Sequence, residues 1–174
     1  GDGVLDYTEY FGDVKYSSRQ LRFEFESLVP QSQFPELYSA VLDALHGKKV
    51  QIVLDEDSDF YYVGRLSVSD FTNNRGIGSI KIDCDCDPYK YKKNATTVSK
   101  DVSGSLEITL PNLRKRVVPT ITSSATMTFA FGGRTIQHNA GTFIIPTLEL
   151  VKGNNTVTVT GTGNVSFTYQ EGRL

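Results

Sequence analysis

The 174-residue chain has no tryptophan, one methionine, two cysteines and two histidines. No run approaches the ~18 consecutive apolar residues that a membrane-spanning helix needs. Eighteen lysines and arginines stand against 20 aspartates and glutamates, so the formal charge is −2. That balance lacks the basic excess that usually accompanies binding to nucleic-acid phosphates. We therefore expect neither a membrane nor a nucleic acid as a partner.

The two cysteines, Cys84 and Cys86, stand two residues apart, after Ile80 and Ile82. In a strand these four side chains point to the same face, so we predict that both cysteines are buried as small apolar residues. A zinc or redox site would need a Cys-x-x-Cys spacing or further ligands, and both histidines are distant in sequence. We expect no metal and no cofactor.

The shortage of histidine also limits catalysis. His46 falls at the end of an expected helix, where the dipole and the free carbonyls favour an imidazolium. His138 ends a short expected strand whose other titratable group is Arg134, and no Gly-x-Ser-x-Gly motif accompanies it. We expect no catalytic residues and no enzyme; a hydrolase that uses His138 is the weaker alternative.

The acidic segment 55–59 has the alternating carboxylates of a calcium loop. Its sixth position is Phe60, where that loop needs glycine, and its twelfth is Leu66, where the loop needs glutamate. We predict a solvated hairpin tip instead.

Charge and threonine are distributed unevenly along the chain. Of the 38 charged residues, 27 lie in residues 1–93, six in 94–119 and five in 120–174, whereas 15 of the 17 threonines lie from Thr96 onward. A change of composition of this kind indicates two modules.

The first module combines strands with one helix. Strict alternation predicts a strand over 20–26, and apolar residues spaced at i, i+3, i+4 and i+7 predict a helix from Phe34 to Leu45, with Pro35 in its first turn. Further strands are predicted over 49–54, 60–68 and 77–86, with a turn over 72–76.

The second module is predicted to be an antiparallel β-sandwich of short threonine-rich strands. The expected strands are 105–110, 117–122, 126–131, 135–138, 142–150, 156–160 and 165–169, and glycine and asparagine turns are expected at 132–133, 153–155 and 161–164. A polar face on such a sandwich suggests sugar binding as an alternative function. The absence of tryptophan, the best stacking platform for a sugar ring, argues against it.

Proline and a mixture of lysine and tyrosine interrupt the strand pattern between the modules, which is typical of an exposed connector. We predict an interdomain junction that contains Asp87, Pro88, Tyr89 and Tyr91. The expected division is a strand-and-helix domain over 1–93, a linker over 94–103 and a sandwich domain over 104–174.

Short motifs in a fixed order resemble the distal tail proteins of long-tailed bacteriophages and prophages of Gram-positive bacteria. They are Gly1 to Thr8, Tyr16 to Phe25, Leu45 to Lys49, Tyr61 to Arg65, Cys86 to Tyr91, Val118 to Ile121, Gly153 to Thr156, Gly161 to Gly163 and Glu171 to Leu174. Together they extend over nearly the whole chain.

The resemblance implies a structural protein at the tip of the virion tail, made in the cytoplasm of the bacterial host. A split-barrel-like first domain would form a hexameric ring that joins the tail tube to the baseplate. A galectin-like, jelly-roll second domain would face receptor-binding or adhesion proteins, and Pro88 to Tyr91 matches the end of the first domain. Family members have further residues before the Gly1 position, so we expect the first domain to lack its opening strands. The alternative to this adaptor role is a module that binds a host cell-wall saccharide.

Overall fold

Strands make up most of the chain in the computed structural model, which describes residues 16–74 and 77–174. The elements are β1 (Arg19–Ser27), η1 (Gln31–Gln33), α1 (Phe34–Leu45), β2 (Lys49–Ile52), η2 (Asp55–Asp57), β3 (Phe60–Asn74), β4 (Ile77–Cys86), β5 (Lys90–Lys92), β6 (Thr96–Asn112), β7 (Thr120–Ser123), β8 (Met127–Phe131), β9 (Arg134–His138), β10 (Gly141–Ile144), β11 (Gly153–Tyr169) and β12 (Gly172–Arg173). The predicted fold class, mainly β with antiparallel sheets and one α-helix, is confirmed.

The described residues divide into two compact units. One unit contains residues 16–52 and 63–88, and the other contains residues 53–62 and 89–174. β3 therefore contributes its first residues to the second unit and the rest to the first. Residues 94–103 were expected as a linker, but β6 begins at Thr96 and continues to Asn112 without a break.

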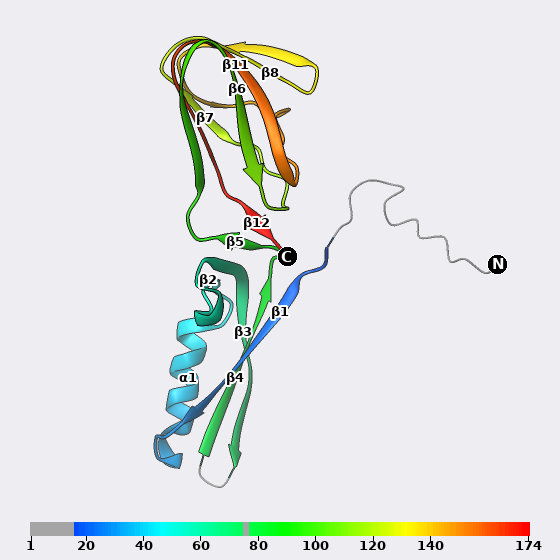
Figure 1. Ribbon diagram of the computed structural model, residues 1–174. Helices are drawn as coiled ribbons and strands as arrows, with labels where there is room; N and C mark the ends of the chain where they lie inside the picture. Colours follow the sequence, from blue (N-terminus) through cyan, green and yellow to red (C-terminus); the bar gives the residue numbers. More distant parts are fainter. Residues whose placement is uncertain (1–15, 75–76) are drawn as a thin grey trace, which may run out of the picture. The chain divides into compact units, whose positions relative to one another are not determined.

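In the first unit, β1, β4 and β3 form an antiparallel sheet, β2 pairs with β3, and α1 lies along one face (Figure 1). The alternating sequence of β1 sets its register, because Phe23 lies opposite Ile82 and Leu21 opposite Cys84 on the apolar face. Arg22 and Glu24 consequently lie on the polar face.

The helix contacts the sheet through aromatic side chains near its first turn. Phe34 is almost fully buried, and its ring lies against Gly78, where a Cβ atom would come within 3.1 Å of it. Phe71 of β3 contacts Phe34 edge-on at a centroid distance of 5.9 Å and stacks on Tyr38 at 5.2 Å. The helix has the predicted bounds because Pro35 fits its first turn and Gly47, with a φ of 77°, follows its end.

Both cysteines are buried on the apolar face of β4, as predicted. Their sulfur atoms are 3.4 Å apart, and burial raises the pKa of Cys86 to about 12. Gly64 of β3 makes room for them, because a Cβ atom there would meet the Cys84 sulfur at 2.5 Å. Two thiols therefore fill the space beside a residue that has no side chain.

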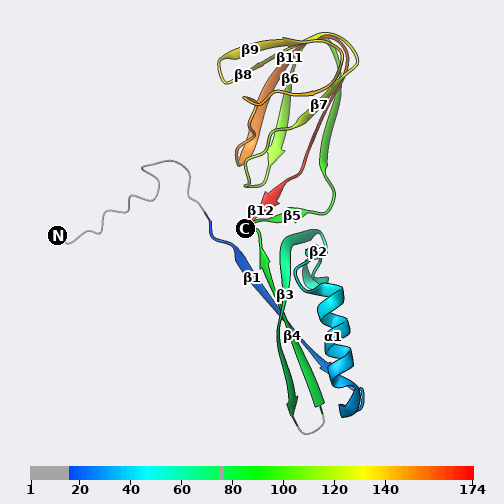
Figure 2. The same ribbon diagram turned by 180° about the vertical axis from the view of Figure 1, so that it is seen from behind.

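The second unit is built on two long strands that pair along their entire length. β6 and β11 match residue for residue from Asn112 opposite Gly153 to Thr96 opposite Tyr169. On its other edge β11 pairs with β8 near Val159 and with β7 near Phe167 (Figure 2). β9 then pairs with β8 and β10 with β7. The side chains between these strands form the core: Val102, Ile108, Leu110, Ile121, Met127, Phe129, Ile145, Leu148, Leu150, Val157, Val159, Val165, Phe167 and Tyr169.

Several predicted boundaries differ from the observed ones. The turn expected over 161–164 lies inside β11, because Gly161 stays in register with Gly104 and the ladder to β6 continues past both. The strand expected over 142–150 ends at Ile144, and the one expected from 117 begins at Thr120. β3 extends to Asn74, into the turn expected over 72–76, whose residues 75 and 76 lie outside the described ranges. β12 was not predicted.

Candidate interaction site on the β3–β5–β12 sheet

Three short strand segments form a small antiparallel sheet within the second unit. Phe60 and Tyr61 of β3 lie opposite Lys92 and Tyr91 of β5, and β12 pairs with the other edge of β5. Ladders this short contain few backbone hydrogen bonds, so side chains must supply much of the cohesion. We call this element the β3–β5–β12 sheet.

One face of the β3–β5–β12 sheet places cations on an aromatic ring. The Lys90 ammonium lies 5.0 Å and the Arg173 guanidinium carbon 5.1 Å from the centroid of Phe60, within the range of cation–π attraction. Lys90 also forms an ion pair with Asp57 of η2. Asp57 therefore attaches the acidic segment 55–59 to β5, while the other four residues of the segment are exposed, in agreement with the predicted solvated tip.

The opposite face stacks two tyrosines. The rings of Tyr61 and Tyr91 are 5.7 Å apart and inclined by 28°, and the Lys115 ammonium lies 5.1 Å from the Tyr91 centroid. The backbone N–H groups of Arg114 and Lys115 both donate to the Gly172 carbonyl. A Cβ atom at Gly172 would come within 3.1 Å of Lys115, so the absence of a side chain there lets Lys115 reach Tyr91.

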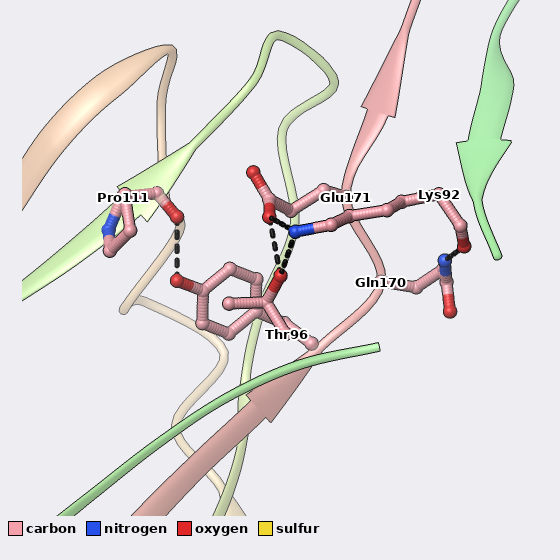
Figure 3. A network of polar contacts seen from close by, with 6 residues as sticks. Lys92, Thr96, Pro111, Gln170 and Glu171 are labelled. Carbon is pink, nitrogen blue, oxygen red and sulfur yellow. Dashed lines mark hydrogen bonds and ion pairs between the residues drawn. The ribbon is translucent and has the colours of Figure 1, made fainter. Parts of the chain in front are cut away.

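A buried carboxylate joins β5, β6 and β12 (Figure 3). Glu171 is 4% exposed, and one of its oxygens accepts hydrogen bonds from the Lys92 ammonium, at 3.1 Å, and from the Thr96 hydroxyl. The Lys92 backbone N–H donates to the Glu171 carbonyl at 2.9 Å, and the Gln170 side-chain amide donates to the Lys92 carbonyl. The charge of Glu171 is thus paired and hydrogen-bonded, as a buried charge must be.

Tyr169, two residues before Glu171, belongs to the sandwich core. Its ring is buried, and its hydroxyl donates to the Pro111 carbonyl at 2.5 Å (Figure 3). Burial, with a smaller contribution from the negative charge of Glu171, raises the pKa of Tyr169 to about 12. The hydroxyl therefore stays protonated and remains a donor at neutral pH.

A surface hollow of about 360 Å³ lies beside Phe60 and the end of β5. It is lined by Asp59, Phe60, Lys92, Lys93, Asn94 and Leu113. Its groups are mixed in charge; Phe60 belongs to β3 and Lys92 to β5, and the other four lie in connecting segments. Phe60 lines this hollow, and Arg173 lies over the Phe60 ring. Aromatic and arginine side chains are enriched at the contact surfaces of proteins.

The predicted junction residues have different surroundings. The backbone N–H of Asp87 donates to the Val63 carbonyl at 2.8 Å in the first unit, whose described residues end at Pro88. Tyr89 belongs to the second unit, and Tyr91 lies in the β3–β5–β12 sheet.

Sequence reasoning missed the residues on the face of the β3–β5–β12 sheet opposite to Tyr91, namely Phe60, Lys90, Lys92 and Arg173, together with Glu171, which pairs with Lys92. One signal was available, because Glu171 and Arg173 are two of only five charged residues after position 119.

Both histidines have structural surroundings. His46 caps α1, as predicted, but its Nδ1 accepts a hydrogen bond from the Val68 backbone N–H at 3.1 Å. An accepting Nδ1 belongs to a neutral ring, so this contact differs from the imidazolium expected there. His138 stacks on Phe143 with centroids 3.5 Å apart, and its Nδ1 lies 3.1 Å from the Asn139 carbonyl oxygen.

Within residues 16–74 and 77–174, no group of three or more histidine, cysteine, aspartate or glutamate side chains is arranged to hold a metal ion. No helix in this part of the chain is long and apolar enough to cross a membrane.

The sequence matches no protein-family model and no curated protein. The fold, however, is similar to that of a solved structure, the SPP1 Dit (gp 19.1) protein, described as a paradigm of the hub adsorption apparatus in phages that infect Gram-positive bacteria. The TM-score is 0.64 over 92% of this chain and 81% of that chain, at 19% sequence identity. At this identity the similarity shows a shared fold.

Proposed function

We propose that this chain is a structural protein of a bacteriophage tail, and that it acts through protein–protein interfaces and not as an enzyme. The observation that carries the proposal is the extent of the structural similarity to SPP1 Dit, which covers 92% of the chain and therefore residues of both units. β-Sandwiches alone occur in proteins of many functions. A strand-and-helix unit followed by a sandwich is a more specific combination.

The finer form of this proposal is a distal tail adaptor at the tip of the virion tail. Copies of the chain would form a ring of six, with the tail tube on one side and the baseplate or receptor-binding proteins on the other. The β3–β5–β12 sheet is a candidate contact surface for one of these partners, because it presents Arg173 and half-buried aromatic rings beside a mixed-charge hollow.

The ring is tested by measuring the mass of the purified chain by light scattering over a range of concentrations. Six chains of 19.3 kDa give about 116 kDa, and we expect this mass or a multiple of it. A monomer at the highest attainable concentration would contradict the ring. Gold-labelled antibody against the chain should bind at the tail tip of intact virions, and labelling elsewhere would contradict the proposed location.

A second candidate function is binding of a cell-wall saccharide by the sandwich. The observation that favours it is a row of hydroxyls across four strands, in which Ser166 of β11 lies between Ser99 of β6 and Thr122 of β7, and Thr142 of β10 follows. The hydroxyls of Thr122 and Thr142 are 3.0 Å apart. Neighbouring hydroxyls of this kind suit a polyhydroxylated ligand.

Titration of host wall polysaccharide by calorimetry tests this second function. The Thr122→Val substitution should weaken binding, and Thr135→Val, an exposed position on β9, is the matched control. Absence of binding at millimolar sugar concentration would rule the saccharide out.

A further inference from the structure

We infer that Arg173 of β12 binds one carboxylate of an acidic peptide segment from another tail protein. The hollow that Phe60 and Leu113 line holds the apolar side chain next to that carboxylate. Because a structural tail protein acts by binding other proteins, this contact rests on the proposed function, and it adds the residue and the chemistry of one interface. Arg173, Phe60 and Leu113 all belong to the second unit.

The first observation is a surplus of one positive charge on one face of the β3–β5–β12 sheet. Lys90, Lys92 and Arg173 share this face, because residues two apart on a strand point to the same side and Arg173 lies opposite Lys90. Asp57 forms an ion pair with Lys90. Glu171 forms an ion pair with Lys92. The charge of Arg173 is therefore the one that a single negative charge of a partner would balance.

The second observation is that the Arg173 side chain keeps its hydrogen-bond donors available. Its guanidinium carbon lies 5.1 Å from the centroid of Phe60, and the residue is exposed. Within residues 16–74 and 77–174 its side chain forms no hydrogen bond and no ion pair. A cation–π contact uses the charge of the guanidinium and requires none of its N–H groups. Their fork matches the two oxygens of a carboxylate, so Arg173 is held over a ring with its donors free.

The third observation is that the hollow adjoins the same ring. Phe60, over which Arg173 lies, also lines the hollow, and half-buried Leu113 adds a second apolar side chain. The volume of about 360 Å³ is near the lower end of the range of ligand pockets, roughly 300–1,000 Å³. A hollow of this size suits one side chain of a partner better than a large ligand.

The rim of the hollow offers groups that can bind a peptide backbone. Asp59 and Asn94 line it, and both are exposed. Their side chains form no hydrogen bond or ion pair in the part of the chain that the structure describes. The backbone N–H of Lys93 donates to the Asp59 carbonyl at 2.7 Å, which connects the two sides of this rim. A carboxylate accepts from a peptide N–H, and an amide both donates to and accepts from a peptide group.

The lining favours a peptide over a phosphate-bearing polymer. Phe60 and Leu113 provide apolar contacts that a polyol phosphate cannot use. Asp59 repels any further negative charge on the ligand. The occupant that matches these groups is a segment with a single carboxylate beside an apolar side chain.

Titration of the full chain with a blocked peptide tests this contact. The probe is acetyl-Gly-Leu-Glu-Gly amide, which has one carboxylate, one apolar side chain and no charged ends. In the isotope-labelled chain we expect saturable changes in the NMR shifts of the backbone amides of Phe60, Lys93 and Arg173, with a dissociation constant of about 1 mM. Absence of saturable changes at these amides up to about 10 mM peptide would overturn the inference.

Two matched peptides separate the charge from the apolar contact. Acetyl-Gly-Leu-Gln-Gly amide lacks the carboxylate, and acetyl-Gly-Ala-Glu-Gly amide lacks the large apolar side chain. Each should bind at least about fivefold more weakly than the probe. Binding of either one as tightly as the probe would contradict the corresponding half of the site.

Substitution of Arg173 separates its fork from its charge. Arg173→Lys keeps the positive charge but loses the paired donors, so it should weaken binding of the probe at least about fivefold and leave binding of the glutamine peptide unchanged. Arg134→Lys, at an exposed position on β9, is the matched control and should bind the probe as the wild type does. Equal affinity of Arg173→Lys and the wild type for the probe would overturn the inference. The shifts of the sandwich core amides verify that each variant is folded.

Inorganic phosphate serves as the competing ligand. At matched ionic strength it should change the shifts of these amides less than the probe does. If it bound at the same amides more tightly than the probe, the site would belong to a phosphate group and the inference would be wrong.

These outcomes are distinguishable from those of the proposed function, because the titration needs only the purified chain. Loss of peptide binding, with the antibody label retained at the tail tip, would overturn the Arg173 contact alone. Peptide binding at Arg173, with the label absent from the tail, would contradict the tail protein as the source of the peptide segment.

Discussion

At the scale of single residues, the buried carboxylate of Glu171 connects elements that are distant in sequence. Replacing Glu171 with glutamine keeps the volume but removes the charge that pairs with Lys92. We expect the free energy of unfolding to fall by about 1–3 kcal/mol, because a charge-assisted bond at a buried site is lost. Urea unfolding followed by circular dichroism measures the change.

A surface ion pair supplies the control for this substitution. Glu149 lies 2.9 Å from Arg116, and both side chains are 46% exposed. Glu149→Gln should cost about 0.5 kcal/mol or less, because water replaces an exposed partner. Equal losses in the two variants would show that burial of Glu171 contributes nothing.

Tyr169 gives a prediction about alkaline pH. Its pKa is about 10 in an unfolded chain and about 12 in the fold. Between these values the native state retains a proton that the unfolded state has released, so the free energy of unfolding falls as the pH rises from 10 to 12, by on the order of 2 kcal/mol.

Tyr169→Phe should remove this part of the pH dependence. The variant should be about 1 kcal/mol less stable at pH 8, where the hydrogen bond to Pro111 is lost, and its stability should change less between pH 10 and pH 12. The raised pKa of Cys86 affects both proteins equally, so the difference between the two curves reports Tyr169. Parallel curves would contradict the prediction.

At the scale of elements, β11 depends on glycines where it passes from β8 to β7. Gly163 has a φ of +143°, and a Cβ atom there would come within 2.5 Å of the Ser124 hydroxyl oxygen. That oxygen is held in place, because it accepts a hydrogen bond from the Asn164 backbone N–H at 2.8 Å. We expect Gly163→Ala to cost about 2–4 kcal/mol in thermal or urea unfolding, from backbone strain and overlap together.

Gly104 on the partner strand separates these two causes. Its φ is +88°, but a Cβ atom there would meet nothing within 4 Å. Gly104→Ala should therefore cost only the strain, about 1 kcal/mol. If Gly163→Ala and Gly104→Ala lower the free energy of unfolding by the same amount, the overlap with Ser124 has no effect.

The same glycines explain which elements sequence reasoning missed. Alternation predicted strands over 156–160 and 165–169, but glycines between them were interpreted as a turn. Only the pairing with β6 shows that Gly161 and Gly163 continue the ladder. The helix over Phe34–Leu45 was predicted accurately, because its signals lie within the helix and its two flanks. Local signals identify such an element, whereas a long-range pairing has no counterpart in the local pattern.

The candidate site was also missed because its residues come together through long-range strand pairing, which the local sequence pattern does not reveal. Tyr91 was predicted as a junction residue through its proline-containing segment, but Glu171 and Phe60 are brought to the neighbouring Lys92 only by pairing of β12 and β3 with β5. The two-residue β12 is too short for any periodic signal. The charges of Glu171 and Arg173 were the available evidence, since charged residues are rare after position 119. They gave no indication that this segment pairs with β5.

At the scale of the whole molecule, the ends of the second unit determine which fragment will fold. A fragment over 89–174 retains β5 and the Lys92 partner of Glu171, while one over 96–174 keeps the sandwich strands but loses both. A fragment over 104–174, the domain expected from composition, lacks the half of β6 that pairs with Val165 to Tyr169. Since that half forms one edge of the sandwich core through Val102 and Val98, its removal exposes apolar side chains such as Phe167.

We therefore expect the 89–174 fragment to be the most stable of the three, the 96–174 fragment to be less stable and the 104–174 fragment to be the least stable. The 89–174 fragment should unfold cooperatively, the 96–174 fragment should unfold at a urea concentration lower by an amount that corresponds to about 1–3 kcal/mol, and the 104–174 fragment should show no cooperative transition. Adding Glu171→Gln to both longer fragments is the decisive comparison. The substitution should destabilise the 89–174 fragment and have a smaller effect on the 96–174 fragment, where Lys92 is already absent. An equal effect in both would mean that Thr96 alone, and not Lys92, stabilises the buried carboxylate.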